Sequence, residues 1–222
     1  MRRLAFFLAL IPLVGACCRQ GGFTSAEREI IRRSDSVMYL TVLFDPADSA
    51  VLRSPSRDLP LSEIRGEDFR TLGAKMLATV QSPKQDGVGI AAPQVGINAR
   101  VIAVWRSDKE GEPFELYANV HLDSLWGEVT HGPEGCLSYP PYRGLVPRHS
   151  SVLVSYVDPQ TLEHRQDTVH GYSAIIFQHE CDHLDGHLYI DRADTVFHNP
   201  SWAAEREAFD YSKPEWMKAL KR

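Results

Sequence analysis

Residues 174–186 read AIIFQHECDHLDG, an apolar run followed by two histidines four positions apart. The apolar residues at the start of this stretch favour a helix that is buried against the rest of the protein. A helix places residues four positions apart on one face, so the imidazoles of His179 and His183 can bind a single metal ion. We therefore expect a helix from about residue 172 to about residue 186 that carries a metal site inside the fold.

A third metal ligand has to come from another part of the chain. Metallopeptidases with the pattern H-E-x-x-H-x-x-G-x-x-H have a third histidine six residues after the second, but Tyr189 occupies that position here and His187 is out of register. Cys136 is the best candidate, because the glycines and the proline around it predict a loop with free backbone amides. A thiolate and two imidazoles leave one position open for water, as in catalytic metal sites. Glu180 would lie beside that open position as a general base.

A glycine-rich stretch, GVGIAAPQ at residues 87–94, precedes both of these segments. Its two glycines let the backbone approach a substrate closely, and Gln94 can offer a side-chain N–H to a developing oxyanion. A pair of glycines also occurs in dinucleotide-binding loops, but those need a third glycine between a strand and a helix. That pattern does not follow here, so we interpret the stretch as part of a substrate site.

Taken in order, the three segments resemble the motifs of the peptide deformylase family, G-x-G-x-A-A-x-Q, E-G-C-x-S and H-E-x-D-H. Residues 87–94, EGCLS at residues 134–138 and HECDH at residues 179–183 carry the similarity, which extends over about residues 51–192. The resemblance implies hydrolysis of the formyl group from the N-terminal formyl-methionine of a peptide, with one divalent metal ion. Fe²⁺ is the ion that the family usually uses, and Zn²⁺, Ni²⁺ and Co²⁺ suit the same ligands.

The resemblance also implies roles for individual residues. The implied metal ligands are Cys136, His179 and His183. Glu180 would carry a proton from the attacking water to the leaving amine, while Gln94 and the backbone N–H of Leu137 would stabilise the oxyanion. The residues implied to line an apolar slot for the methionine side chain are Val88, Tyr172, Ile175 and Ile176. Those implied to contact the peptide backbone or to brace the site are Gly89, Glu134 and Arg143, with Arg148 placed to pair with Glu134.

The N-terminus departs from the family, whose chains usually start close to residue 51. The basic pair Arg2-Arg3 precedes an apolar run, residues 4–14, and small residues follow before Cys17. A basic start, a short apolar run and small residues in this order predict a secretory signal. The run is too short for a membrane-spanning helix, which needs roughly 20 residues. The pattern also resembles a bacterial lipobox, so we expect a lipid on Cys17 and an exported protein held at a membrane. The alternatives are a buried N-terminal helix and a true start at Met38.

Export conflicts with the reaction that the resemblance implies. Formylated nascent chains are made in the cytoplasm, where an exported enzyme would not meet them. The substrate would then be an external formylated peptide or another N-acyl amide, and an exported metallopeptidase is a competing hypothesis. Further alternatives are a structural zinc site and a non-catalytic lipoprotein that binds formyl-peptides or metal. Catalysis is favoured because Glu180 and Gln94 are both present, and because a structural zinc site usually has four protein ligands rather than three.

The composition is typical of one globular domain with extensions. The chain has 222 residues and a net charge of −5, without the basic patch that nucleic-acid binding requires. We therefore expect no nucleic acid as partner. The resemblance implies a formylated peptide as partner, and we expect a monomer. The four cysteines lie at the lipobox or in the metal-site motifs, which argues against a disulfide framework. The expected parts are a signal segment at residues 1–17, an extension at 18–50, a catalytic domain at 51–195 and a tail at 196–222.

The remaining patterns predict an α+β protein: mainly antiparallel β-sheets packed around the central metal-binding helix, with helical extensions at both ends. Residues 59–66 and the glycine- and proline-containing stretch that follows residues 127–130 are predicted as loops. Asn119-Val120 replaces an Asn-Pro of the family and is expected to loosen its turn. Helical or amphipathic stretches are predicted at residues 24–34, 67–80 and 203–209. The predicted strands are residues 37–44, 100–105, 114–120, 151–157 and 167–170.

Overall fold

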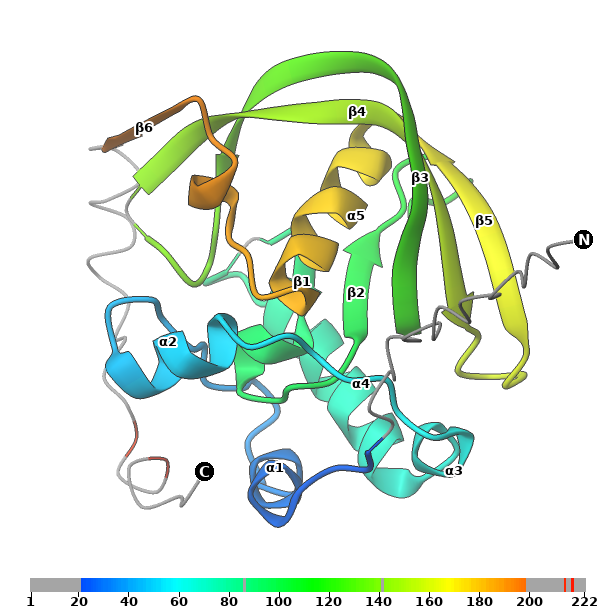
Figure 1. Ribbon diagram of the computed structural model, residues 1–222. Coiled ribbons are helices and arrows are strands. Elements are labelled where there is room, and N and C mark those ends of the chain that lie inside the picture. The colour runs from blue at the N-terminus through cyan, green and yellow to red at the C-terminus, as the bar shows by residue number, and fades with distance from the viewer. Residues whose placement is uncertain (1–20, 86, 141, 199–213, 215–216, 218–222) are drawn as a thin grey trace, which may run out of the picture.

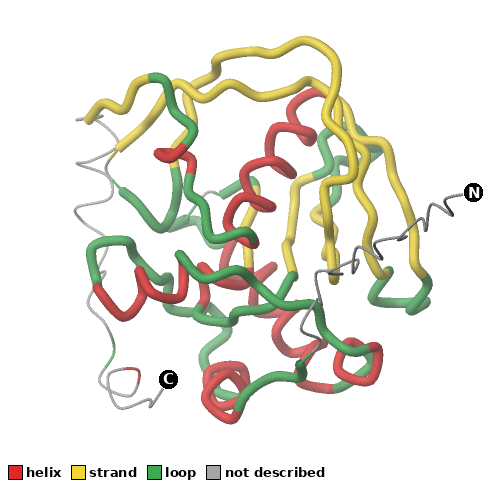
Figure 2. The backbone as a smooth tube through the Cα atoms, viewed as in Figure 1, coloured by secondary structure: helices red, strands yellow, loops and turns green. Residues whose placement is uncertain are grey.

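The computed structural model describes residues 21–85, 87–140, 142–198, 214 and 217. The expected signal segment, Cys17 and the amphipathic stretch at residues 203–209 lie outside these residues. A six-stranded sheet curves around one long helix, α5 (Gly171–Leu184), and the N-terminal helices lie at the opposite end of the molecule (Figure 1; helices are red in Figure 2). The α+β class is confirmed. No helix in this part of the chain is both long enough and apolar enough to cross a membrane.

The sheet is antiparallel throughout. Its strands follow the order β1-β2-β3-β4-β5, and β6 pairs with β4. The strands are β1 (Gly89–Ala91), β2 (Val101–Trp105), β3 (Phe114–Gly135), β4 (Tyr142–Val157), β5 (His164–His170) and β6 (Thr195–His198). The pairing of β3 with β4 has register shifts between residues 118 and 121, 122 and 124, and 126 and 129. Such irregularities bend and twist a strand, and the two strands arch over α5 (Figure 1).

The other helices are α1 (Ser25–Ile31), α2 (Pro46–Leu52), α3 (Leu61–Ile64) and α4 (Glu67–Val80), with short 3-10 helices η1 (Ala92–Val95) and η2 (Tyr189–Asp191). The first of them begins at a capping box, in which Thr24 and Glu27 each accept the backbone N–H of the other. α4 lies close to β3 at Gly73, where an added Cβ would come within 2.5 Å of Leu116 Cδ2. A larger residue at this position would have to displace the Leu116 side chain.

Strand β2 divides the interior into two apolar clusters. Its side chains alternate between the two faces of the sheet. Val101 and Ala103 join a cluster with α1 and α4, whereas Ile102 and Val104 join a cluster with α5. Both faces of β2 are therefore buried, and α5 is held inside the protein.

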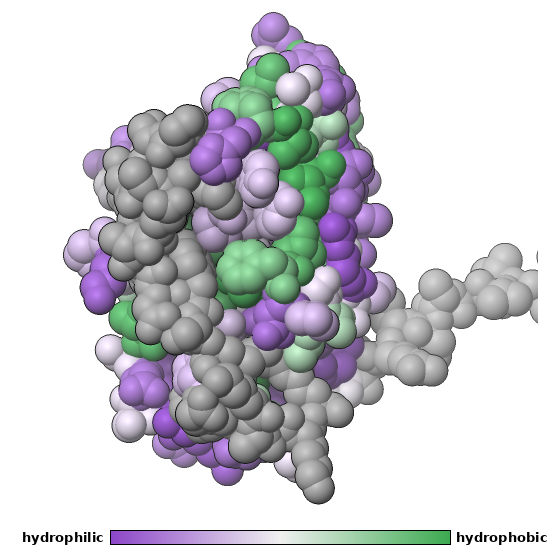
Figure 3. Space-filling view, turned by 90° about the vertical axis from the view of Figure 1, so that its left-hand side faces the viewer, coloured by the Kyte–Doolittle hydropathy of each residue, from purple (hydrophilic) through white to green (hydrophobic). Residues whose placement is uncertain are grey.

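The surface around the last strand, β6, carries exposed apolar side chains. Figure 3 looks onto the side that carries β6, and apolar side chains gather there in a band. On β6 and the adjoining end of β4 the exposed apolar residues are Leu145, Val196 and Phe197.

Residues 37–44 form no strand, although their composition favours one. The middle of the segment is buried, at Met38, Leu40, Thr41 and Val42, but its backbone N–H groups bond to different parts of the fold. Met38 donates to Thr79 Oγ1, Thr41 to the carbonyl of Gln94, and Leu43 to the carbonyl of Ser138. The segment is an extended bridge between elements, because its N–H groups donate to three separate parts of the described chain and not to one strand.

The stretch predicted as a loop before Cys136 is also different. Residues 127–135 continue β3 and pair with β4, so β3 is much longer than the predicted strand at residues 114–120. Residues 59–66 contain α3, and α1 ends three residues earlier than the predicted helix at residues 24–34. Besides α3, the elements that were not predicted are α2, β1, β6 and the 3-10 helices η1 and η2. The side chain of Asn119 makes two 2.8 Å hydrogen bonds with the backbone of Leu59, and the loosening expected from Val120 in place of proline stays a prediction.

Candidate metal centre

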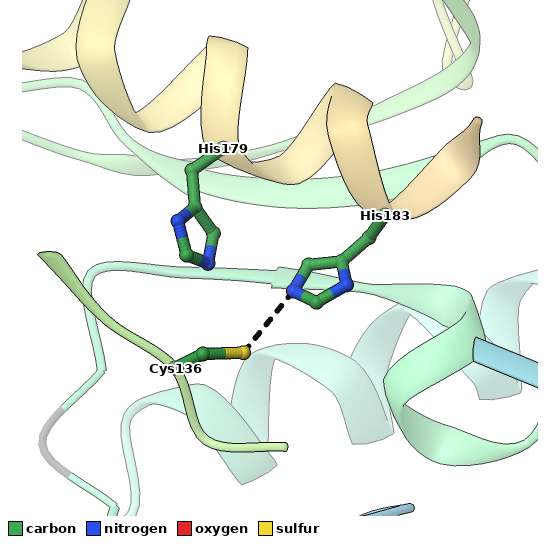
Figure 4. A group of neighbouring side chains, drawn as sticks. All are labelled: Cys136, His179 and His183. Carbon is green, nitrogen blue, oxygen red and sulfur yellow. Dashed lines mark hydrogen bonds between the residues drawn. The ribbon is translucent and has the colours of Figure 1, made fainter. Parts of the chain in front are cut away.

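Two elements that are distant in the sequence bring three metal-binding side chains together. His179 and His183 project from α5, and Cys136 follows directly after the end of β3 (Figure 4). One ligand atom from each of the three lies within 4.8 Å of the others. Cys136 Sγ is 3.2 Å from His183 Nε2. A thiolate and two imidazoles converging in a buried place suit a divalent metal such as Zn²⁺ or Fe²⁺, with a position left for water.

Glu134 fixes the orientation of the first histidine. Its carboxylate is 2.8 Å from His179 Nδ1, so the other ring nitrogen faces the ligand group. Arg148 bonds to the same carboxylate at 2.7 and 3.1 Å. Burial raises the pKa of the Glu134 carboxyl, but the hydrogen bonds from His179 and Arg148 outweigh it and lower that pKa to about 2. An ionised carboxylate behind a ligating imidazole is a common way to orient a metal ligand.

The same arginine reaches a second buried carboxylate. Arg148 donates to Asp182 at 2.7 Å, and Arg192 also donates to Asp182 at 2.7 Å. Asp182 was noticed only as part of a motif, and its pairing with Arg192 was not predicted. Neither arginine is close to the histidines in sequence, so no local pattern indicates this network of charges.

The two histidines differ in their affinity for a proton. Burial alone would lower the pKa of His179, but hydrogen bonds with Cys136 and Glu134 raise it well above the ordinary value. The pKa of His183 is well below the ordinary value, because of burial and the neighbouring charge on His179. Metal binding needs both rings without a proton on the ligating nitrogen, so it is coupled to proton release.

Glu180 is buried beside the ligand group. Its Oε2 atom has no hydrogen-bond partner among the described residues. Burial raises the pKa of its carboxyl to about 7. The backbone of Gly89 is so close that an added Cβ would lie 2.5 Å from Glu180 Oε1. The carboxyl group therefore lies near the backbone of β1, and its Oε2 atom has no hydrogen bond to another described side chain.

Gln94 is buried in η1 with a defined orientation. Its Oε1 accepts the backbone N–H of Ala91 at 2.8 Å, which turns the Nε2 group toward Cys136 Sγ at 3.5 Å. Leu137 is also buried, and the next residue, Ser138, donates its N–H to the same sulfur at 3.4 Å. Amide donors therefore gather around Cys136, although the segment before it is a strand rather than the predicted loop.

A cavity of about 490 Å³ opens beside these groups, and Cys136, His179, Glu180, Gln94 and Leu137 all line it. The residues predicted to bind the substrate or to brace the site also line it: Val88, Gly89, Glu134, Arg143, Tyr172, Ile175 and Ile176. His183 lies behind this surface and is fully buried. Four further residues of the wall formed by β3 and β4 were not predicted, namely Thr130, Gly132, Pro133 and Val146. That wall depends on how the two strands bend.

Two other residues in or near the motif, Tyr189 and Cys181, are buried but do not belong to the ligand group. Tyr189, which stands where a metzincin has its third histidine, is buried and its ring stacks on that of His179 at 6.2 Å between centroids. Cys181 is buried in the cluster between α5 and the sheet, and burial raises the pKa of its thiol. Neither Cys136 nor Cys181 forms a disulfide. Cys181 therefore belongs to the core and not to the ligand group.

Comparison with known proteins gives a consistent result. Residues 41–199 match the polypeptide deformylase family. A peptide deformylase from Leptospira biflexa is 37% identical over 149 residues, which is 64% of this chain and 82% of the relative. A class I type b peptide deformylase from Acinetobacter baumannii with Met-Ala-Ser bound is 32% identical and has a TM-score of 0.62, over 70% of this chain and 98% of that one. The actinonin-bound form of the same protein has the same identity and TM-score, over 71% of this chain and 99% of that one.

Proposed function

This chain belongs to the peptide deformylase family, and on that premise we propose how its own residues hydrolyse the formyl group of an N-terminal formyl-methionine. The observation that carries the proposal is the meeting of Cys136, His179 and His183 within 4.8 Å at a cavity that Glu180 also lines. The protein is a metal-dependent hydrolase by family. We propose the roles of its individual residues, its native metal and its location.

Cys136, His179 and His183 would hold one divalent ion. We assign Fe²⁺ as the native ion, with Zn²⁺, Ni²⁺ and Co²⁺ as ions that the same donors accept. Such an ion supplies Lewis acidity and makes water a nucleophile near neutral pH. Replacing Cys136 with alanine should abolish stoichiometric metal binding, measured by elemental analysis after dialysis. Full metal content and activity in that variant would refute the assignment.

Glu180 moves the proton. Its carboxylate accepts a proton from the water that attacks the formyl carbon and then passes it to the amine of the leaving peptide. The unpaired Oε2 and the pKa near neutrality support this role, because a catalytic acid–base group works best when its pKa is close to the operating pH. A cation bound nearby would favour the ionised form of the carboxyl, which is the form that accepts the proton.

Gln94 and the backbone N–H of Leu137 stabilise the negative charge that develops on the formyl oxygen. The bond from Ala91 holds the Gln94 amide in place before the substrate arrives, and preorganised donors of this kind are typically worth about 3 kcal/mol each. The methionine side chain occupies the apolar slot of Val88, Tyr172, Ile175 and Ile176. Gly89 and Arg143 lie where the peptide backbone would pass. The binding of Met-Ala-Ser and actinonin by the Acinetobacter baumannii relative supports a peptide substrate.

The site should select formyl over acetyl groups. An acetyl methyl would have to fit against the backbone at residues 87–89, which lines the cavity together with Glu180. The size of one methyl is worth only ~1–3 kcal/mol. A carbonyl displaced from Gln94 and the Leu137 amide leaves those donors unpaired, which costs more. We therefore expect discrimination well beyond what the size of a methyl would give.

The decisive experiment compares turnover of formyl-Met, acetyl-Met and unblocked peptides by protein that has been purified anaerobically. Rapid hydrolysis of the formyl peptide alone supports the proposal. Comparable kcat/KM values for formyl and acetyl peptides would show a broader N-acyl amidase, and absence of turnover with tight peptide binding would show a binding protein of the same fold.

We also propose that the protein is exported, carries a lipid on Cys17 and acts as a monomer on external formylated peptides. The support is the basic pair, apolar run and small residues of positions 2–17. One acyl chain anchors a protein only marginally, so stable attachment needs the several chains of a bacterial lipoprotein. Cell fractionation followed by N-terminal analysis tests this, and a cytoplasmic protein that starts at Met1 or Met38 would refute it.

A further inference from the structure

Trp105 is the last residue of β2 and connects two walls of the cavity without lining it. Its backbone N–H donates to the carbonyl of Val88 at 2.8 Å, on the glycine-rich side of the slot. Its ring packs edge-to-face with that of Tyr172, with 6.2 Å between ring centroids and an angle of 78°. Val88 and Tyr172 both line the cavity, whereas Trp105 is not among the residues that do so. Its influence on a bound peptide must therefore pass through these two neighbours.

The chain is tied to the start of α5 at the same place. Ser173 donates its hydroxyl to the carbonyl of Trp105 at 3.2 Å. The next residue, Arg106, places its guanidinium 5.7 Å from the centre of the Phe177 ring, one turn farther along the helix. The end of β2 thus determines where the first turns of α5, and with them Tyr172, stand relative to Val88.

The Tyr172 side chain needs such support. It is 51% exposed and belongs to the second residue of α5. An exposed ring without a neighbour would adopt several rotamers, and binding a substrate would then require ordering it. The described residues provide one ring contact to Tyr172, and that is the edge of Trp105.

We infer that Trp105 is a positioning residue for specificity: it holds Tyr172 against the mouth of the slot and so sets the preference for a long apolar first side chain. The inference rests on the proposed function for the identity of that side chain. Trp105 is not placed among the ligands, Glu180 or Gln94. Its loss should therefore change the preference among side chains more than the rate for a substrate that has none.

The test is binding of the tripeptides Met-Ala-Ser and Gly-Ala-Ser to the metal-loaded protein, by calorimetry, followed by KM and kcat for their formyl derivatives. An edge-to-face pair of rings corresponds to about a two- to tenfold change in an equilibrium constant. We expect Trp105→Ala to reduce the Met-to-Gly affinity ratio by about this factor, through weaker binding of the Met peptide, with kcat little changed. Trp105→Phe should restore most of the ratio. Trp105→Leu also removes the ring contact but keeps an apolar side chain against the core. It replaces Trp105→Ala in the test if the alanine variant folds poorly, and the same fall in the ratio is expected.

A matched control is Trp126→Ala, because Trp126 makes a similar edge-to-face contact, with His170 at 6.4 Å, away from the cavity. It should leave the ratio unchanged. In a Tyr172→Ala background, Trp105→Ala should have no further effect on the ratio, since the ring through which it acts is gone.

The inference is overturned if Trp105→Ala and Trp105→Leu lower affinity for both peptides equally, or leave the ratio unchanged. It is also overturned if the wild-type protein binds both peptides equally. A clear Met preference that depends on Trp105, in a protein without deformylase turnover, would instead sustain this inference and refute the proposed catalytic function.

Discussion

Replacing Arg148 with methionine removes the cation that two buried carboxylates share. The side chain of Arg148 is 4% exposed, and those of Glu134 and Asp182 are 9% and 6% exposed. Arg148 makes a two-pronged bond with the first carboxylate at 2.7 and 3.1 Å and a single bond with the second at 2.7 Å. Methionine keeps most of the length of the side chain and its apolar contacts, so the variant tests the charge.

The size of the effect follows from what each carboxylate retains. Removal of one partner from a buried ion pair typically destabilises a protein by about 3–5 kcal/mol, since it leaves an uncompensated charge. Asp182 keeps Arg192 at 2.7 Å, and Glu134 keeps its bond with His179 at 2.8 Å. We therefore expect the lower end of the range, about 3 kcal/mol. For a domain of this size that corresponds to a fall of roughly 6–12 °C in Tm.

The measurement is unfolding by urea and by heat in the presence of a chelator, so that metal binding does not contribute to the apparent stability. Arg165→Met is the matched control, because Arg165 bonds to Asp158 and Glu163 at 3.2 Å but is 45% exposed. Exposed pairs are worth about 0–1 kcal/mol. The double variant Arg148→Met with Glu134→Gln should recover part of the loss, because it removes one of the two carboxylate charges that have lost Arg148.

Arg148→Met should also weaken metal binding by about 10–100-fold, since Glu134 orients His179 less firmly without its arginine. The reasoning would be refuted if Arg148→Met were no more destabilising than Arg165→Met. It would also be refuted if the double variant were less stable than Arg148→Met alone, because the loss would then come from packing or hydrogen bonding and not from charge.

Three further changes test other parts of the site and its support. Glu180→Gln should keep its metal and lose turnover by about 10²–10⁴-fold; near-normal turnover would remove this residue from the mechanism. Gly89→Ala should also keep its metal but lose about 10²-fold in kcat, because the new Cβ displaces the Glu180 carboxyl; an unchanged kcat would contradict the close approach. Burial would raise the pKa of Glu27, but hydrogen bonds with Arg57 and the backbone lower it below 4.5. Its stabilising effect is then present above pH 4.5 and lost as the pH falls through the folded-state pKa. Glu27→Gln should therefore cost about 1.5–3 kcal/mol of unfolding free energy near pH 7 and progressively less in acid; a difference that is independent of pH would refute this.

The sequence alone determined the parts of the site that depend on local geometry. A helix with residues at fixed spacing places two histidines on one face whatever surrounds it, so the pair at residues 179 and 183 was readable without a structure. The helix at residues 67–80 was predicted with its observed ends for the same reason, because its apolar period is a local property. The glycines and the proline around Cys136 pointed to the candidate third ligand, and the family motifs added the residues that line the cavity.

The tertiary structure decided what depends on contacts between distant segments. The register shifts that bend β3 and β4 over α5 bring Cys136 to the histidines, and strand pairing of that kind is not encoded in the composition of either strand. Residues 37–44 have the composition of a strand, but among the described residues no single strand pairs with them. The bonds that connect Arg148 and Arg192 with Asp182, and the contact of Trp105 with Tyr172, likewise exist only in the folded chain. Their physical reason is the same: a helix makes its hydrogen bonds within a few residues, whereas a strand or a buried charge is satisfied only by a partner that folding brings to it.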